Sequence, residues 1–206
     1  MSTLDMTAMY AMHDALRRDM THLARFAGQA GDEPRRVLAT AVGWDLFKTS
    51  LHIHHTAEDD ALWPAMRQRL VDRPDELALL DAMEAEHAAI DPILQDIEAA
   101  LGEPEAPVGD LLDALVTALN GHLEHEEGAA LPVIGAFLTP EQWGHFGQVH
   151  AQRIGPNAPR LLPWLLDGAD ERVRATMLSP LPEPAYQAYL TQWQPAYEAL
   201  ELWRRA

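Results

Sequence analysis

Apolar residues recur every three to four positions along most of residues 1–138, a spacing that predicts amphipathic helices. Ala, Leu, Glu, Asp, Arg and Met dominate this part of the chain, and β-branched residues are sparse. Short runs rich in Gly, Pro and Asp interrupt the pattern at 28–34, 72–74 and 102–110. The breaks leave four helices of roughly 25 residues joined by short loops, which predicts an all-α, antiparallel up-down four-helix bundle over residues 1–138.

The sequence changes character after residue 138, where eight of the 15 prolines and four of the six tryptophans lie. Thr139, Pro140 and Gln142 have the pattern of an N-cap, a first-turn proline and a capping box, which predicts a helix over roughly 140–152. A proline-punctuated stretch follows, and a terminal helix is predicted over about 185–204. We expect residues 139–206 to form a helical extension that packs on the bundle as a lid, a dimer surface or a structural cap.

Charge and composition exclude several classes of protein. The chain has 32 acidic residues and 15 Lys+Arg, a formal net charge of −17, which argues against nucleic acid or an anionic membrane as a partner. It has no cysteine, so any metal must be held by histidine and carboxylate. The N-terminus has no signal-peptide pattern and no apolar run approaches about 18 residues, so we expect a soluble cytoplasmic protein. The oligomeric state stays open.

Residues 54–64 and 122–132 share one pattern, H-x-x-x-E-[D/E]-x-A-x-[W/L]-P. A histidine and a glutamate four residues apart lie on one face of a helix, so each segment can offer an imidazole and a carboxylate to the same ion. The first and third predicted helices each open a periodic segment with a histidine. The candidate metal ligands are therefore His13, His54, Glu58, His87, His122 and Glu126.

The two repeated segments place these ligands on apolar helix faces. The same faces carry Phe47, Leu51, Ala61 and Leu62 in one helix, and Leu115, Leu119, Ala129 and Val133 in the other. A buried glutamate without a partner is strongly unfavourable, and two facing carboxylates would also repel each other. A pair of metal ions removes both problems, with two bridging carboxylates and four terminal imidazoles. Iron, manganese and zinc all suit this ligand set.

Several titratable residues near the pattern stay ambiguous. Positions off the inward face, and hence in solvent, are predicted for His52, His55, Asp59, Asp60, Glu124 and Glu127. His55 and His125 could still orient metal ligands from outside the coordination shell. Asp91 is open between a further ligand and a surface residue, and Tyr10 could reach the cavity. We expect structural or exposed positions for His22, His145 and His150.

These residues resemble the hemerythrin-like family, in its bacterial HHE cation-binding branch. The resemblance covers roughly residues 8–138 and is carried by the six candidate ligands with the Leu-Trp-Pro and Leu-Pro that follow them. It implies a four-helix bundle around a non-haem centre of two iron ions, oxo- or hydroxo-bridged, that binds dioxygen or related small oxidants. In the oxygen-carrying hemerythrins the third helix has two histidines four apart, whereas Asp91 occupies the second position here. That substitution puts a five-histidine site and simple reversible oxygen carriage in doubt.

Ferritin-like di-iron bundles are excluded because they need two Glu-x-x-His motifs, and the chain has one, Glu84-Ala85-Glu86-His87. The leading hypothesis is a di-iron protein that binds or senses dioxygen, nitric oxide or peroxide. The first alternative is a di-iron redox enzyme that consumes peroxide or oxygen, catalase-like or an oxidase. The second is an iron-storing or structural metal bundle. Any catalysis should reside in the metal, because no separate nucleophile or acid–base constellation accompanies the ligands.

Overall fold

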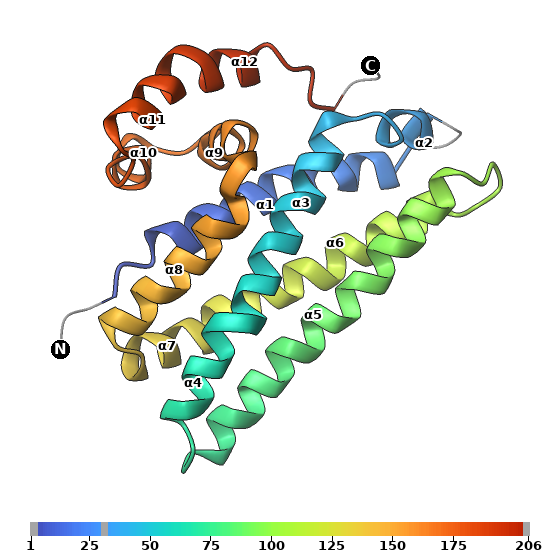
Figure 1. Cartoon of the computed structure of the whole chain (residues 1–206). Helices are drawn as coiled ribbons and strands as arrows, with labels where there is room; N and C mark the ends of the chain where they lie inside the picture. Colours follow the sequence, from blue (N-terminus) through green and yellow to red (C-terminus); the bar gives the residue numbers. More distant parts are fainter. Residues whose placement is uncertain (1–3, 30–32, 204–206) are drawn as a thin grey trace.

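The structure is a computed structural model that describes residues 4–29 and 33–203 (Figure 1). Within these residues every regular element is a helix, which confirms the all-α fold class predicted from the sequence. None of the described helices is long and apolar enough to cross a membrane.

The long helices of residues 7–125 lie side by side (Figure 1). They are α1 (Thr7–Ala27), α3 (Val42–Ala57), α5 (Pro74–Leu101) and α6 (Val108–His125). Helix α6 packs against both α1 and α5, and α1 also packs against α3. The ends of α5 follow from its sequence, because Pro74 suits the first turn of a helix and Gly102 follows the last.

A short helix, α2 (Glu33–Leu38), stands where the second predicted helix was expected to begin. The chain turns at residues 39–41 before α3 starts, and Ala41 has an extended backbone. Arg35 of α2 donates hydrogen bonds to the backbone carbonyls of Pro104 (3.1 Å) and Ala106 (2.9 Å), in the loop between α5 and α6. The prediction of one continuous helix from residue 34 is therefore wrong at its start, because α2 turns aside to pack on α5 and α6.

Two π-helical segments follow the repeated histidine–glutamate pairs. They are η1 (Glu58–Leu62), which leads into α4 (Trp63–Arg69), and η2 (Glu126–Ala130), which leads into α7 (Leu131–Phe137). Trp63 donates its N–H to the carbonyl of Glu58, and Leu131 donates its N–H to the carbonyl of Glu126. Each bond spans five residues, whereas an α-helical bond spans four. The next residue is Pro64 or Pro132, which has no N–H for a regular α-helical bond, so the wider turn is favoured.

The residues after 138 form more helix than the sequence predicted. They contain α8 (Pro140–Ile154), η3 (Gly155–Asn157), α9 (Ala158–Leu166), α10 (Glu171–Leu178), α11 (Glu183–Ala188), η4 (Tyr189–Trp193) and α12 (Gln194–Glu198). The predicted capping box of α8 is present, with Thr139 and Gln142 bonded reciprocally. The terminal helix ends at Glu198, short of the predicted end near residue 204, which lies outside the described residues.

The extension packs on α1 and α3 through α8, α9 and α10 (Figure 1). At its centre, the buried carboxylate of Asp19 accepts a hydrogen bond from Trp164 Nε1 at 2.7 Å and pairs with Arg18 at 3.0 Å. Arg18 Nη1 also donates to the backbone carbonyls of Trp164 (2.9 Å) and Asp167 (2.8 Å). These polar contacts fix α9 against α1.

The apolar core of the bundle is divided into two clusters by a layer of polar side chains. On α1, His13 lies between Met9 of one cluster and Leu16 of the other. The same order is found on α3 and α5, where His54 and His87 separate residues of the two clusters. The fold thus places a layer of imidazoles and carboxylates between the two apolar clusters.

Candidate metal centre

The six predicted metal ligands converge in this polar layer. All are buried, with exposed fractions of 3% or less, and they come from α1, α3, η1, α5, α6 and η2. They are His13, His54, Glu58, His87, His122 and Glu126. Whether these side chains bind metal stays a prediction, but the fold brings all of them together.

The four imidazoles form two close pairs. His13 Nε2 lies 3.2 Å from His54 Nε2, and His87 Nε2 lies 3.1 Å from His122 Nε2. Each pair joins neighbouring helices, and each points its Nε2 atoms toward the same small volume. The two pairs thus correspond to two positions for a metal ion.

Each glutamate contacts one imidazole of each pair. Glu126 Oε2 lies 3.1 Å from His13 Nε2 and 3.9 Å from His122 Nε2. Glu58 is placed in the same way, with its two carboxylate oxygens 3.5 Å from His54 Nε2 and His87 Nε2 respectively. The two carboxylates therefore connect the two histidine pairs, which is the arrangement that two bridging carboxylates require.

The protein compensates the burial of these carboxylates only in part. Glu126 lies beside the imidazole of His13, 3.1 Å away, but the four oxygens of Glu58 and Glu126 form no hydrogen bond of good geometry with the described residues. Burial and the neighbouring Glu126 raise the pKa of Glu58 well above its usual range. Burial acts in the same direction on Glu126, but the adjacent His13 outweighs it and lowers the pKa of Glu126. Buried acceptors without donors are unfavourable, and a pair of cations between carboxylate oxygens and imidazole nitrogens would satisfy them.

A second ring of carboxylates supports the histidines from outside. His13 Nδ1 lies 2.8 Å from Glu127 Oε1, and His87 Nδ1 lies 2.8 Å from Asp59 Oδ1. The prediction that Asp59 and Glu127 simply face solvent is wrong, because each follows its glutamate at the start of a π segment and reaches a histidine on the neighbouring helix. Such contacts fix the tautomer and ring orientation of a metal-binding histidine. The signal was present in the repeat, whose [D/E] position is shared by both segments.

Glu86 of α5 supports the histidines of α6 in the same way. Its two carboxylate oxygens lie 2.9 Å from His122 Nδ1 and 2.8 Å from His125 Nδ1. His125 is 40% exposed, whereas His122 is buried, so the choice of His122 as the inward residue agrees with the structure. Sequence reasoning missed Glu86, although it stands directly before His87.

The charges around His13 differ from those around the other imidazoles. Burial lowers the pKa of His13, but the carboxylates of Glu126 and Glu127 outweigh it and raise this pKa to about 9. Burial opposes ionisation of Glu127, but hydrogen bonds from His13 and Arg17 lower its pKa to about 2. Burial lowers the pKa of His54 well below its usual range. In the absence of metal, His13 is therefore protonated at neutral pH and can donate to its neighbours.

Comparison with known protein families identifies this arrangement. Residues 5–134 match the family model described as the hemerythrin HHE cation binding domain. The chain belongs to this hemerythrin family. No curated protein and no solved structure matches it. The matched region contains all six candidate ligands and their supporting carboxylates, and it ends before the extension.

His55 is an additional imidazole in this hemerythrin-like centre. It is 4% exposed, and its ring stacks on His87 with centroids 3.9 Å apart. A ring nitrogen of His55 lies within 4.8 Å of ligand atoms of His87 and His122. The prediction that His55 faces solvent is wrong because α3 lies between α1 and α5, so adjacent residues His54 and His55 face different neighbouring helices. The repeat contained the signal, since His55 aligns with Leu123, which is also buried.

Asp91 and Tyr10 do not join the centre. Asp91 is exposed on α5, and Tyr10 is 44% exposed on α1. The position that departs from the oxygen-carrying hemerythrins is thus at the surface, while His55 lies beside His87 and His122 from another helix.

Three further histidines, His22, His145 and His150, lie outside the group of candidate ligands. His145 is exposed, and His22 stacks on Trp203 with ring centroids 5.1 Å apart. His150 of α8 lies against His54, with ring centroids 6.1 Å apart, and its Nε2 is buried without a hydrogen-bond partner among the described residues. Burial lowers the pKa of His150 to about 4. Among the described residues of the extension, His150 is the histidine that lies against a candidate ligand.

Proposed function

We propose that this centre holds two iron ions and binds dioxygen, nitric oxide or peroxide. The observation that supports it best is the pair of buried carboxylates, each touching one imidazole of both histidine pairs, with four oxygens that lack hydrogen bonds. The family match supports cation binding, and the choice of iron follows the resemblance to hemerythrins. A bound iron pair would supply redox-active ions able to exchange electrons with a small oxidant.

The protein's own groups would fix and enclose the ions. His13 and His54 would hold one ion, His87 and His122 the other, and Glu58 with Glu126 would bridge them. His55 is proposed as a further ligand on the side of His87 and His122. The outer carboxylates accept from Nδ1 and so keep Nε2 free for metal. The two apolar clusters on either side exclude water.

The proposal includes the order and direction of the helices around the centre. We infer an up-down four-helix bundle built from α1, α3–α4, α5 and α6–α7, which the short connections and the packing of α6 on α1 and α5 support. The division into a bundle of residues 1–138 and an extension of residues 139–206 stays a prediction. A cytoplasmic location also stays a prediction.

The first experiment is elemental analysis of the freshly purified chain, followed by anaerobic reduction and a stoichiometric pulse of oxygen while the visible spectrum is recorded. We expect two irons per chain and a reversible charge-transfer band. Fewer than two transition-metal ions per chain would contradict the dinuclear centre. An iron-loaded protein with no spectral change would favour storage or a structural role instead.

A ligand variant tests the assignment directly. Glu126→Ala should lose metal and lower the melting temperature of the metal-loaded protein, because bound metal stabilises the folded state by mass action. The metal-free variant should also melt below metal-free wild type, because the change leaves the imidazolium of His13 without its buried partner 3.1 Å away, so iron content is the deciding measurement. Glu124→Ala, an exposed position on the same helix, is the matched control and should leave both values unchanged. Unchanged iron content in Glu126→Ala would contradict the ligand assignment.

A redox enzyme is a second candidate, favoured by a cavity that reaches the centre. Asp91 is exposed and therefore does not open a coordination position, but a large cavity reaches His54. A centre that only binds gases has no need of such a cavity. Rapid decay of the oxygen-induced band, or sustained oxygen evolution from peroxide, would favour the enzyme.

A further inference from the structure

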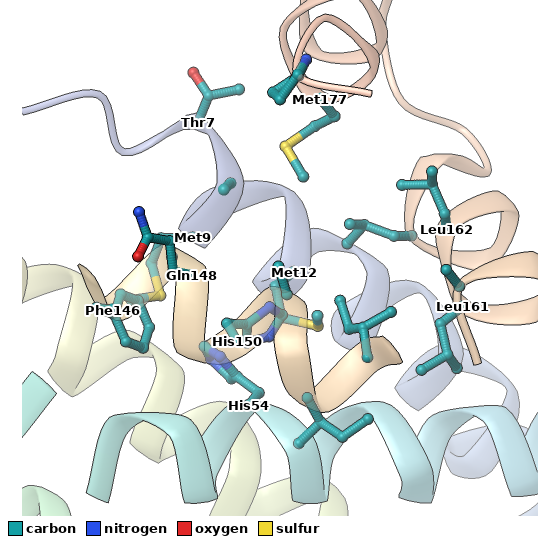
Figure 2. A pocket seen from close by; sticks show the side chains of 18 of the residues that line it. Thr7, Met9, Met12, His54, Phe146, Gln148, His150, Leu161, Leu162 and Met177 are labelled. Carbon is teal, nitrogen blue, oxygen red and sulfur yellow. The ribbon is translucent and has the colours of Figure 1, made fainter. Parts of the chain in front are cut away.

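A cavity of about 600 Å³ lies between the bundle and the extension (Figure 2). Residues of α1, α3, α8, α9 and α10 line it, and most of them are apolar, including Met12, Phe146, Leu161 and Met177. Pockets for small organic molecules have volumes of about 300–1,000 Å³. The cavity therefore has the size of an organic ligand rather than that of a diatomic gas.

One end of the cavity reaches the metal centre. His54 lines it, and His150 of α8 lies next to His54 with the two ring planes at 82° (Figure 2). Phe146 lies beside His150, with ring centroids 6.3 Å apart, and Leu161 and Leu162 of α9 lie on the other side of the two histidines (Figure 2). A molecule in the cavity would have one end beside His54 and the rest against apolar side chains.

Two polar atoms at this end have no partner. Ser50 Oγ and His150 Nε2 are both buried and form no hydrogen bond with the described residues. Ser50 is 1% exposed and lies one turn before His54 on α3, so the two side chains share a helix face. A hydroxyl and an imidazole nitrogen can each donate or accept, so together they suit a hydrogen-bonding group of the ligand.

The charges around the cavity limit the ligand further. Among the described lining residues there is no lysine or arginine, so an anionic head would be buried without a counter-charge. Asp5, the acidic residue of the lining, is exposed and already accepts from the N–H of Thr7 at 2.9 Å. It lies in the N-terminal segment ahead of α1, away from Ser50 on α3. The head group at Ser50 and His150 should therefore be uncharged.

We propose that this cavity binds a neutral organic molecule with an elongated apolar body and one hydrogen-bonding head group, which pairs with Ser50 and His150 beside His54. The inference goes beyond the proposed metal function, because it rests on the cavity and its two unpaired polar atoms and not on what the ions bind. It assigns to the extension the role of forming a binding site.

Isothermal titration calorimetry of the full-length protein, as purified, with 1-octanol and octanoate tests this proposal. We expect saturable binding of one 1-octanol per chain, and at least tenfold weaker binding of octanoate, since the two probes share a chain length and differ in head charge. Absence of saturable 1-octanol binding would overturn the proposal. Octanoate binding as tightly as 1-octanol would overturn the neutral head group.

Two variants locate the site. Leu162→Trp should fill the cavity and weaken 1-octanol binding at least tenfold, whereas Leu190→Trp, an exposed leucine of the extension that does not line the cavity, should bind as wild type does. Ser50→Ala should weaken binding about fivefold through loss of one neutral hydrogen bond, with Ser179→Ala as its matched control. Wild-type affinity in both Leu162→Trp and Ser50→Ala would contradict the assignment.

Circular dichroism and metal content are measured on each sample. Lost 1-octanol binding with normal iron refutes the cavity proposal alone. Normal 1-octanol binding in a protein without iron refutes the metal proposal alone. The two proposals therefore fail separately.

Discussion

Removal of the Glu127 carboxylate should weaken one of the two metal positions and spare the other. Glu127 contacts His13 Nδ1 at 2.8 Å, and its other close partner among the described residues is Arg17, not the His87–His122 pair. Loss of an outer carboxylate typically lowers metal affinity about 10–100-fold, or roughly 1.4–2.7 kcal/mol. A hydrogen bond to a charged group, worth about 1.5–3 kcal/mol, gives the same range. We therefore expect Glu127→Ala to bind one ion normally and the second 10–100-fold more weakly.

The size of this loss should depend on pH. Metal must displace the proton of His13, whose pKa is raised to about 9 by Glu126 and Glu127. Removing Glu127 lowers this pKa and so reduces competition from protons, which offsets part of the lost affinity below pH 9. The full loss is expected above pH 9, where His13 becomes largely neutral in both proteins, and a smaller loss is expected at pH 7.

Titration with Co²⁺ against a competing chelator, followed by the visible spectrum, measures both affinities. Asp59→Ala is the complementary variant and should weaken the ion held by His87 instead, because Asp59 contacts His87 Nδ1. Glu124→Ala, exposed on the same helix as His122, is the control and should bind as wild type does. If the Glu127→Ala isotherm at pH 9 superimposes on that of the wild type, the outer carboxylate has no role in metal binding.

Two further predictions concern the attachment of the extension. Gly43→Ala should lower the free energy of unfolding by about 1–3 kcal/mol in urea denaturation, because a Cβ there would lie 2.6 Å from the Trp203 ring; Gly121→Ala, with open space around its Cβ, should not be destabilising. For Asp19, burial raises the pKa of the carboxyl, so its folded-state pKa exceeds the unfolded value and its contribution to stability is lost as pH rises. The stability of wild type minus that of Asp19→Asn, which keeps an acceptor for Trp164, should therefore fall as pH rises from below 3.8. A pH-independent difference in urea denaturation would show that Asp19 is not desolvated.

The metal centre was more accessible to sequence reasoning than its surroundings. Four-residue spacing on apolar faces specifies which side chains share a buried stripe, so His54 and Glu58 could be placed together from the sequence. Hydrogen bonds between helices depend on how those helices are rotated against each other, which one sequence does not reveal. For this reason Glu86 was missed, and Asp59 was expected in solvent.

The inward position of His55 and the helices of the extension were missed for related reasons. A single stripe was assumed for α3, but a helix packed between two others buries two adjacent faces, and His55 lies on the second. In the extension, the spacing of the prolines predicts breaks between helices where the structure has helix starts. Several of them lie in the first turn of a short helix, as Pro159 does in α9 and Pro184 in α11, where proline is well tolerated.

The division of the core into two apolar clusters has a consequence for folding. Each cluster can form by burying its own apolar side chains, but the layer between them holds the desolvated carboxylates of Glu58 and Glu126, which lack the hydrogen bonds that cations could replace. Ion uptake should therefore be the step that joins two partly independent ends of the molecule into one cooperative unit. The supply of the metal ion would then govern how long the newly made chain persists.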